Sequence, residues 1–406
     1  MHRLLLSFLL LLSSIILHAG GFQLNAQGQR QMGMGHCGTG LMTDNASLFF
    51  NPGITPFLEH KFEITAGTNL IAHRTIYLEP APGVYTDSMK HDVGTPFELY
   101  VNYHVKNFDI GLAVYTPFGS KAAWPDDWKG AALIQEISLK TIFIQPTVSC
   151  KVNDRIGIGF GYIYAIGGFE LQQQIPVQDS TGAYGKATLD GSASGMGFNT
   201  GLFFKINDHF SAGISYRSSV NVEVKDGSAE FKVPSSLADH FPATTFSSNI
   251  KLPSVTNFGL GYSGDKWKVA LDLNFVGWHT YDTLHIDFKD NTDKLADVHS
   301  ARMYKDTYII RGGAEYMIDN SCTVRFGAYY DHTPVQDGYL TPETPDADRI
   351  GITCGATVKA TKKLSFDFSL LYIEAMKRYD QNLETGFAGT YKTRVIAPGF
   401  GFRASI

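Results

Sequence analysis

The side chains of this chain that could do chemistry are scattered, and their spacing does not favour catalysis. No Ser/His/Asp set and no Cys/His set stands at a spacing that suggests a nucleophile with its base. The 13 histidines form no paired motif. The four cysteines, Cys37, Cys150, Cys322 and Cys354, show neither a CxxC pair nor metal-ligand spacing. We therefore expect no enzyme, no bound metal and no other cofactor, and we interpret the cysteines as small apolar wall residues.

Charged residues recur on one side of segments that alternate between apolar and polar residues. On that side, an arginine such as Arg311 or Arg325 could bind a ligand carboxylate through two parallel hydrogen bonds. The other interpretation is that these charges neutralise one another and hold an enclosed segment in place. For each residue, both interpretations remain open. The charged residues on this side are Lys61, Glu63, Asp272, Arg311, Glu315, Arg325, Asp367 and Arg403.

The alternation predicts β-strands with one apolar face. In residues 364–372, leucine, phenylalanine and tyrosine occupy every second position, and serine or aspartate stands at three of the four positions between them. Residues 398–406 alternate in the same way up to the last residue. A transmembrane β-barrel needs this pattern, because only its lipid face is apolar. A soluble β-sandwich also alternates, but it explains neither an export leader nor the strand at the chain's end.

The first residues predict an export leader. His2 and Arg3 precede an apolar run of about 14 residues, which is shorter than the roughly 20 that a membrane-spanning helix needs. We interpret residues 1–19 as a signal peptide that is cleaved after Ala19. No later window is apolar for roughly 18 residues, which argues against helical membrane spans. The net charge is −5 without a long basic run, so nucleic acid is not an expected partner.

Short polar turns alternate with longer loops along the chain. The short turns are Lys106-Asn107, Asn153-Asp154, Asn207-Asp208, Gly264-Asp265, Asp319-Asn320 and Thr361-Lys362-Lys363. Tight turns at one end and long loops at the other are typical of bacterial outer-membrane barrels. Fourteen strands are predicted to begin near residues 60, 96, 108, 137, 156, 195, 210, 255, 267, 307, 322, 348, 364 and 394. This even number lets the last strand pair antiparallel with the first.

Residues 20–59 do not fit the wall of the predicted barrel. They show no strand alternation, and the stretch from Gln27 to Gly40 is too rich in glycine for a stable helix. Side chains alone fill barrels of about eight strands, so fourteen strands would enclose an open channel. We expect residues 20–59 to fold inside the lumen of the barrel formed by residues 60–406. The alternative is a disordered periplasmic tail.

Several short motifs are spread over nearly the whole chain. They are Gly21-Phe-Gln-Leu-Asn25, Asp44-Asn-Ala46, Asn51-Pro52, Tyr115-Thr-Pro-Phe-Gly119, Trp124-Pro-Asp-Asp-Trp-Lys-Gly130, Gln145-Pro146, Asp331-His-Thr-Pro-Val335 and Pro345-Asp-Ala-Asp-Arg349. In type and order these motifs resemble the FadL family of outer-membrane transporters for long-chain fatty acids and aromatic hydrocarbons. The resemblance implies an all-β, fourteen-stranded antiparallel barrel whose N-terminal segment is a hatch.

The resemblance also implies how this chain works. Hydrophobic ligands would pass the hatch without an external energy source, with Asn51 and Pro52 fixing the exit of the hatch toward the first strand. The chain departs from the family at Gly53, where relatives often have alanine, and at its last residue, Ile406, where barrels usually end in phenylalanine. The first departure leaves the hatch assignment standing, and the second concerns only assembly efficiency.

An apolar segment between residues 227 and 253 is the predicted capture site. We interpret it as an external loop, and so many apolar residues on a loop need either a packed loop core or a ligand surface. By analogy with the family we favour ligand capture. The candidate ligand-binding residues in it are Phe231, Leu237, Phe241 and Phe246.

Pro146 is the predicted site of a lateral opening. It lies within an expected strand, where a residue without an N–H leaves one ladder hydrogen bond unmade. In the family, a wall gap next to the third strand serves as a lateral exit, and Pro146 is placed where it could help to form one. The other interpretation is a bulge without a transport role.

These observations predict a monomeric outer-membrane channel for the passive uptake of hydrophobic molecules such as long-chain fatty acids. Its partners would be a hydrophobic small-molecule ligand and outer-membrane lipid. The alternatives are a receptor for haem or another lipid in the outer membrane, or a FadL-like barrel that serves as a secretion shuttle. A porin for polar solutes fits least, because it would need neither a hatch nor an apolar capture surface.

Overall fold

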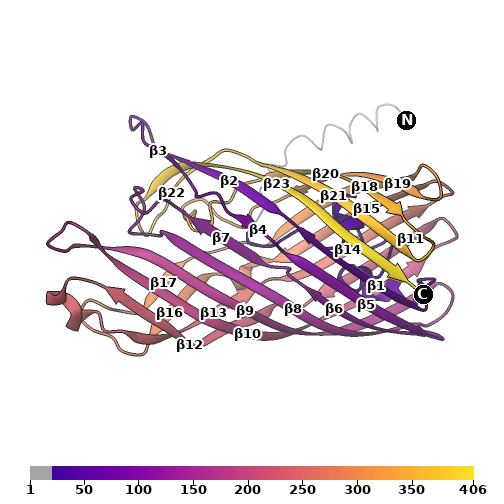
Figure 1. Cartoon of the computed structure of the whole chain (residues 1–406), viewed down its shortest axis with the longest axis horizontal. Coiled ribbons are helices and arrows are strands. Elements are labelled where there is room, and N and C mark those ends of the chain that lie inside the picture. Colours follow the sequence, from indigo (N-terminus) through magenta and orange to yellow (C-terminus); the bar gives the residue numbers. More distant parts are fainter. Residues whose placement is uncertain (1–20) are drawn as a thin grey trace, which may run out of the picture.

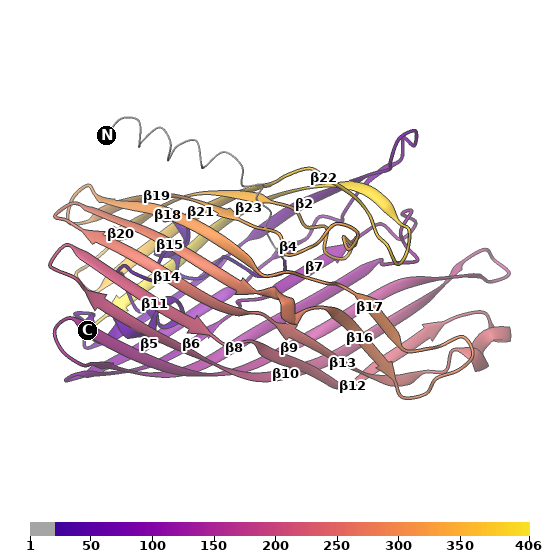
Figure 2. The same ribbon diagram turned by 180° about the vertical axis from the view of Figure 1, so that it is seen from behind.

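The alternation of side chains builds a closed wall of fourteen antiparallel strands. The computed structural model describes residues 21–406, and its first wall strand pairs with the last, with Thr65 opposite Arg403. One tilted sheet therefore closes on itself (Figures 1 and 2), which confirms the predicted barrel. Within residues 21–406, no helix has the length and apolar character to cross a membrane. The predicted signal peptide, residues 1–19, lies outside the described residues.

Several wall strands are divided by a bend, and their halves carry separate labels. In chain order the wall consists of β1 and β2 (Phe62–Asn69, Ile71–Leu78), β5 (Phe97–Val105), β6 and β7 (Phe108–Tyr115, Gly119–Ala123), β8 (Glu136–Lys151), β9 (Ile156–Gln178), β10 (Tyr184–Lys205), β11 and β12 (Phe210–Arg217, Val220–Lys232), β13 and β14 (Thr244–Leu252, Ser254–Ser263), β15 and β16 (Trp267–Gly277, Thr283–Phe288), β17 and β18 (Val298–Ala301, Thr307–Met317), β19 (Cys322–Asp331), β20 (Arg349–Lys359), β21 and β22 (Leu364–Ala375, Arg378–Gln381) and β23 (Ala388–Ser405). Two short strands, β3 (Thr86–Ser88) and β4 (Val93–Gly94), pair with β2 inside the first long connection.

The barrel has a turn end and a loop end. β23 finishes at the turn end, and at the loop end β9 and β10 continue as a long hairpin (Figure 1). Strand β10 begins at Tyr184 rather than near residue 195, and β13 begins at Thr244 rather than near residue 255. The predicted starts are too late because the outer face of these strands becomes polar toward the loop end. Lys186 and Asp190 of β10 are examples, and there the apolar alternation that marks a strand in the sequence is lost.

Strand β21 illustrates the two faces of the wall. Phe368 and Leu370 point outward and are 45% and 43% exposed, whereas Asp367 and Ser369 point inward and are buried. Exposed apolar side chains of this kind recur around the barrel and form its outer belt. The predicted assignment of apolar residues to the outer face and charges to the lumen is therefore correct for this strand.

Residues 21–59 lie inside the barrel toward the turn end (dark indigo in Figure 1). They contain α2 (Gln29–Met32), α3 (Ser47–Phe50) and the 3-10 helix η1 (Pro52–Phe57), and they contact strands on several sides of the wall. A methyl group on Gly40 would overlap the backbone of Gly259 in β14. Glycine thus allows this segment's backbone to touch the wall, which explains part of its glycine-rich composition.

The segment between residues 227 and 253 is not the external loop that its composition predicts. Its first residues belong to β12 and its last to β13, and the short helix η2 (Ser235–His240) lies in the connection between them. Phe246 stands opposite Gly227 in this hairpin and is buried. The prediction of a loop is wrong because alternate apolar residues of this segment line the inner face of the wall. Composition alone does not distinguish such a wall face from a ligand-binding loop. A further short helix, η3 (Trp278–Thr280), links β15 to β16.

Candidate functional site

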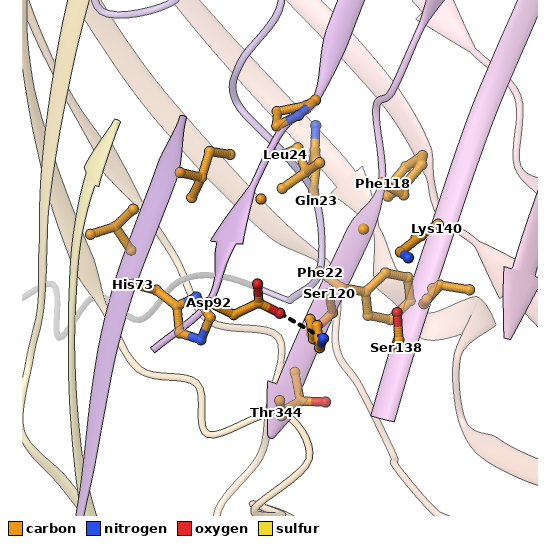
Figure 3. A pocket seen from close by; sticks show the side chains of 18 of the residues that line it. Phe22, Gln23, Leu24, His73, Asp92, Phe118, Ser120, Ser138, Lys140 and Thr344 are labelled. Atoms are coloured by element: carbon orange, nitrogen blue, oxygen red, sulfur yellow. Dashed lines mark ion pairs between the residues drawn. The ribbon is translucent and has the colours of Figure 1, made fainter. Parts of the chain in front are cut away.

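A cavity of about 570 Å³ lies between the start of the N-terminal segment and the wall. Its volume falls within the roughly 300–1,000 Å³ that is typical of small-molecule sites. In Figure 3, Phe22, Leu24 and Phe118 surround it with strands β2, β7 and β8. Apolar side chains form much of its surface, and they include Phe22, Leu24, Ile71, Met89, Phe118 and Leu139.

The wall is interrupted beside this cavity. Residues 116–118 separate β6 from β7, and β7 pairs with β8 but not with β5, which begins only at Phe97. The exposed residues Val93 and Phe97 line the same cavity as the buried residues Phe22 and Phe118. The cavity therefore reaches the outer surface of the wall. We call this place, between residues 93–97 and residues 116–123, the wall gap.

The start of the N-terminal segment is hydrogen-bonded to the bend between β6 and β7. The N–H of Leu24 donates to the carbonyl oxygen of Pro117 over 2.9 Å, and the N–H of Gly119 donates to the carbonyl oxygen of Phe22 over 3.1 Å. These bonds satisfy backbone groups that the bend has turned away from the wall. The N-terminal segment therefore completes the lining of the cavity at the wall gap.

The ion pair Asp92–Lys121 lies at the wall gap, and just beyond it Lys90 pairs with Asp126 over 2.8 Å and donates its N–H to the carbonyl oxygen of Ala123 over 2.7 Å. Lys121 Nζ of β7 lies 2.6 Å from a carboxylate oxygen of Asp92 and 3.2 Å from one of Glu136, and the Asp92 contact is the dashed line in Figure 3. The Lys121 ammonium holds the pKa of Asp92, in the connection before β4, below its ordinary value. Partly exposed pairs of this kind contribute about 0–1 kcal/mol, so this closure of the gap is weak.

The first described residues are anchored on the far side of the cavity. Gly21 donates its N–H to Asp346 Oδ2 over 2.8 Å. The ring of Phe22 packs edge-on against Trp278 and Tyr281, with centroids 4.8 and 5.3 Å away. Asp346 belongs to the connection between β19 and β20. The start of the N-terminal segment is thus held between two distant parts of the chain.

Nearly the whole chain matches one protein family. The family model described as "Outer membrane protein transport protein (OMPP1/FadL/TodX)" matches residues 10–404. The chain belongs to this family. It is therefore an outer-membrane transport protein, which confirms both the resemblance found in the sequence and the predicted location. By the general orientation of bacterial barrels, the turn end faces the periplasm and the loop end faces the outside.

Individual relatives are distant in sequence but similar in length and fold. The chain is 23% identical over 392 residues to a long-chain fatty acid transport protein of Salmonella typhi, covering 87% of each chain. The crystal structure of a Pseudomonas aeruginosa FadL homologue superimposes with a TM-score of 0.83 at 17% identity, covering 95% of this chain and 100% of that one. The Ralstonia pickettii toluene transporter TbuX gives a TM-score of 0.72 at 15% identity, with coverage of 95% and 100%. These structural matches show the shared fold.

Asn51 and Pro52, the predicted hatch residues, lie where α3 meets η1. The side-chain amide of Asn51 donates to the carbonyl oxygens of Thr39 and Leu202 over 2.8 and 3.0 Å, and its Oδ1 accepts from the N–H of Gly53 over 3.0 Å. Pro52 opens η1, where its missing N–H leaves no helical bond unmade. Asn51 therefore ties the N-terminal segment to β10, and the hatch role of both residues remains a prediction.

Arg311 and Arg325, the predicted carboxylate ligands, are engaged by the protein itself. Arg325 Nε donates to Glu315 Oε2 over 2.6 Å, and Arg311 donates to Asn25 Oδ1 over 2.7 Å. Arg30 of the N-terminal segment also donates to both carboxylate oxygens of Glu315, over 3.0 and 2.9 Å. Neither Arg311 nor Arg325 lines the cavity at the wall gap. These contacts favour the interpretation that the lumenal charges hold the enclosed segment, and ligand contact by either arginine remains untested.

The structure separates the predicted capture residues into two groups. Phe231 and Phe241 lie with ring centroids 5.9 Å apart near the tip of the β12–β13 hairpin, and Leu237 lies in η2 nearby. Phe246 is apart from them in the wall's interior core, where it packs against Phe169. None of the four lines the cavity at the wall gap. Their role in ligand capture remains a prediction. The residues near the hairpin tip are placed where they could contact a ligand, whereas the buried Phe246 could do so only after a rearrangement.

Pro146 lies in β8, opposite Leu112 of β6, and faces outward. The ladder between β8 and β9 is interrupted around it, with pairing present up to Ile144 and again from Thr147. The wall continues on both sides of this short interruption. The larger interruption lies at the wall gap, one strand away, so a lateral-opening role for Pro146 itself remains a prediction.

Sequence reasoning missed most of the residues that build the cavity. Asp92 and Asp346 sit in connections and Lys121 in the short strand β7, where no extended alternation marks them. A local signal did exist in the motif of residues 115–119, because Pro117 interrupts an otherwise alternating strand. That interruption marks the bend at the wall gap better than Pro146 does.

Proposed function

We propose that this protein is a channel for the passive uptake of hydrophobic molecules such as long-chain fatty acids. The observation that carries the proposal is the largely apolar cavity that opens through the wall gap. A long-chain fatty acid transport protein among its relatives and a toluene transporter among its structural neighbours support this class of ligand.

The wall gap is the exit in this proposal. A hydrophobic molecule that leaves the cavity sideways passes from an apolar pocket into lipid without crossing bulk water. Because the apolar surface of the molecule stays out of water, this transfer avoids the cost of hydrating that surface and requires no external energy source. The weak Asp92–Lys121 closure is compatible with repeated opening by thermal motion.

Residues 20–59 act as the hatch of a barrel formed by residues 60–406. Support comes from the contacts that hold this segment in the lumen, among them two hydrogen bonds of 2.9 Å from the N–H groups of Gly38 and Thr39 to Asp272 Oδ2. The hatch closes the lumen to ions while the cavity remains available to ligand. The channel works as a monomer in contact with membrane lipid, and no step of this function needs catalysis or nucleic acid.

A cross-link over the wall gap tests the exit. In a background with all four cysteines replaced by serine, Asp92→Cys and Lys121→Cys are joined by a short bismaleimide in intact cells. A matched control joins Lys151→Cys and Asp154→Cys at the periplasmic turn after β8, where the wild-type side chains also form an ion pair, of 2.7 Å. Uptake of a labelled long-chain fatty acid is measured in cells that lack any other transporter.

We expect the cross-linked gap to lose most of its uptake while the control keeps it. Binding of the same fatty acid to the purified, cross-linked barrel should persist, because the apolar side chains that line the cavity are unchanged. Full uptake after complete cross-linking would rule out exit through the wall gap. Absence of fatty-acid binding to the unmodified barrel would contradict the proposed ligand class instead.

A further inference from the structure

The last apolar row of the outer belt on strands β2, β23 and β21 can be read from their register. Ala72 stands opposite Ile396, and Ile396 stands opposite Tyr372. The neighbouring residues Thr75 and Thr393 point inward, where their hydroxyls are 2.8 Å apart and line the cavity. Ala72, Ile396 and Tyr372 therefore face outward, at the boundary between the apolar belt and the extracellular side.

The next two rows outward carry three cations and one carboxylate, with Lys392 in the second row, opposite Ile76. Arg74 stands directly opposite Arg394, and Arg394 stands opposite Glu374. Arg394 Nε lies 2.7 Å and Lys392 Nζ 2.9 Å from the carboxylate oxygens of Glu374. Within residues 21–406, Arg74 has no ion-pair partner. One carboxylate thus faces three cations on the outer surface.

This surplus is unfavourable unless an anion occupies the row. Like charges directly opposite on neighbouring strands repel each other. The position of the row decides what anion is available, because it adjoins the exposed apolar side chains of Ile396 and Tyr372, against which acyl chains pack. The arginine guanidinium matches the geometry of a phosphate group through parallel hydrogen bonds. Basic clusters at this depth attract anionic lipid headgroups.

We propose that Arg74, Arg394 and Lys392 form a binding site for the phosphate group of a lipid in the outer leaflet, such as phosphorylated lipid A. The lipid's phosphate lies between Arg74 and Arg394, and its acyl chains run down the apolar belt below Ile396. Tyr372, whose hydroxyl donates to Glu374 over 2.5 Å, borders the site on the far strand. This site is on the outside of the wall and is independent of the transported ligand.

Native mass spectrometry of the purified full-length barrel, titrated with bisphosphorylated lipid A, tests this site. The test variant carries Arg74→Gln, Lys392→Gln and Arg394→Gln. The control carries Arg155→Gln, Lys266→Gln and Lys362→Gln, which remove the same charge from the periplasmic turns. We expect about a fivefold loss of affinity per charge removed, and on the order of 100-fold for the test variant. The control should bind like the wild type.

Two single variants keep the proposal testable if the triple variant does not assemble. Arg74→Gln removes the unpaired cation and should weaken lipid binding about fivefold. Glu374→Gln removes the competing carboxylate and should strengthen it. A merely structural ion-pair cluster would give the same sign for both changes or no effect on lipid binding.

Two further comparisons separate lipid phosphate from other sources of affinity. Dephosphorylated lipid A should bind the wild type as weakly as phosphorylated lipid A binds the triple variant. Inorganic phosphate at equal concentration should not displace the lipid. Equal binding of both lipids, full displacement by inorganic phosphate, or unchanged binding by an assembled triple variant would each overturn the proposal.

Discussion

Gly21 and Asp346 are 325 residues apart in sequence, and a hydrogen bond of 2.8 Å joins the N–H of Gly21 to Asp346 Oδ2. The same oxygen, Asp346 Oδ2, also accepts a hydrogen bond from the hydroxyl of Thr333. Burial raises the pKa of Asp346 to about 6, although Arg349 and the two hydrogen bonds act in the opposite direction. The start of the N-terminal segment is therefore held by a group that titrates in mildly acidic solution.

The attachment of the N-terminal segment should depend on pH through Asp346. The pKa is raised in the folded state above the ordinary 3.8, so the folded protein binds this proton more tightly than the unfolded chain. The stabilisation of the attached segment by protonated Asp346 is fully present below about pH 4 and is lost as the pH rises through about 6. Hydrogen exchange of the amides of Gly21 and Leu24, corrected for intrinsic rates, should show protection that falls between these values. Asp346→Asn should remove this dependence, and Asp337→Asn, on the exposed part of the same connection, should not.

Gly21→Ala should detach the start of the N-terminal segment. Gly21 has a φ of +73°, and an added methyl group would overlap the ring of Trp278. Gly386→Ala is the matched control, because Gly386 has a φ of +68° and open space where its methyl group would lie. We expect faster exchange of the Leu24 amide only in Gly21→Ala. Unchanged exchange of the Leu24 amide in Gly21→Ala would mean that neither the backbone strain at residue 21 nor the overlap with Trp278 detaches the segment.

Glu315→Gln should loosen the N-terminal segment in the lumen. Glu315 accepts hydrogen bonds from Arg30 of that segment and from Arg325 of the wall, and loss of a buried pair typically costs about 3–5 kcal/mol. Planar-bilayer recordings should then show more frequent ion-conducting openings than the wild type. Glu374→Gln, on the outer surface, should leave the current unchanged. If Glu315→Gln shows no more ion-conducting openings than the wild type, other contacts are sufficient to keep the lumen closed.

Phe246 and Phe241 should respond differently to truncation. Phe246→Ala removes a buried ring and should lower the free energy of unfolding by about 3–5 kcal/mol in denaturant titrations. Phe241→Ser, near the hairpin tip, should leave stability nearly unchanged but weaken binding of a hydrophobic probe. Unchanged probe binding in Phe241→Ser would return the tip to a purely structural role.

Lys140 should distinguish fatty acids from neutral hydrocarbons. It lies at the edge of the cavity by the wall gap, and within the described part of the chain it makes no ion pair. If it contacts a ligand carboxylate, Lys140→Gln should weaken fatty-acid binding roughly tenfold, as expected for a charged hydrogen bond. Toluene binding should not change, and Lys363→Gln at a periplasmic turn serves as control. Equal losses for both ligands would point to a packing effect rather than to charge recognition.

The local pattern of the sequence was sufficient for the wall. Side-chain alternation in β21, the short turns and the even strand number all follow from the period-two geometry of a strand with one lipid face. The non-alternating, glycine-rich stretch before β1 likewise predicted that residues 20–59 are not part of the wall, and the described residues 21–59 contain no wall strand. Each of these features depends on neighbours in sequence, and so each was visible without a structure.

Only the tertiary structure decided which distant residues meet. Closure of the barrel brings Gly21 to Asp346, Arg30 to Glu315 and Arg74 to Arg394, pairs separated by more than 280 residues in each case. The structure also showed that residues 227–253 form a hairpin of the wall instead of the expected loop, and that the larger wall interruption lies at the bend before β7 rather than at Pro146. Such contacts depend on strand tilt and register around the whole circumference, and the alternation of one strand carries no information about them.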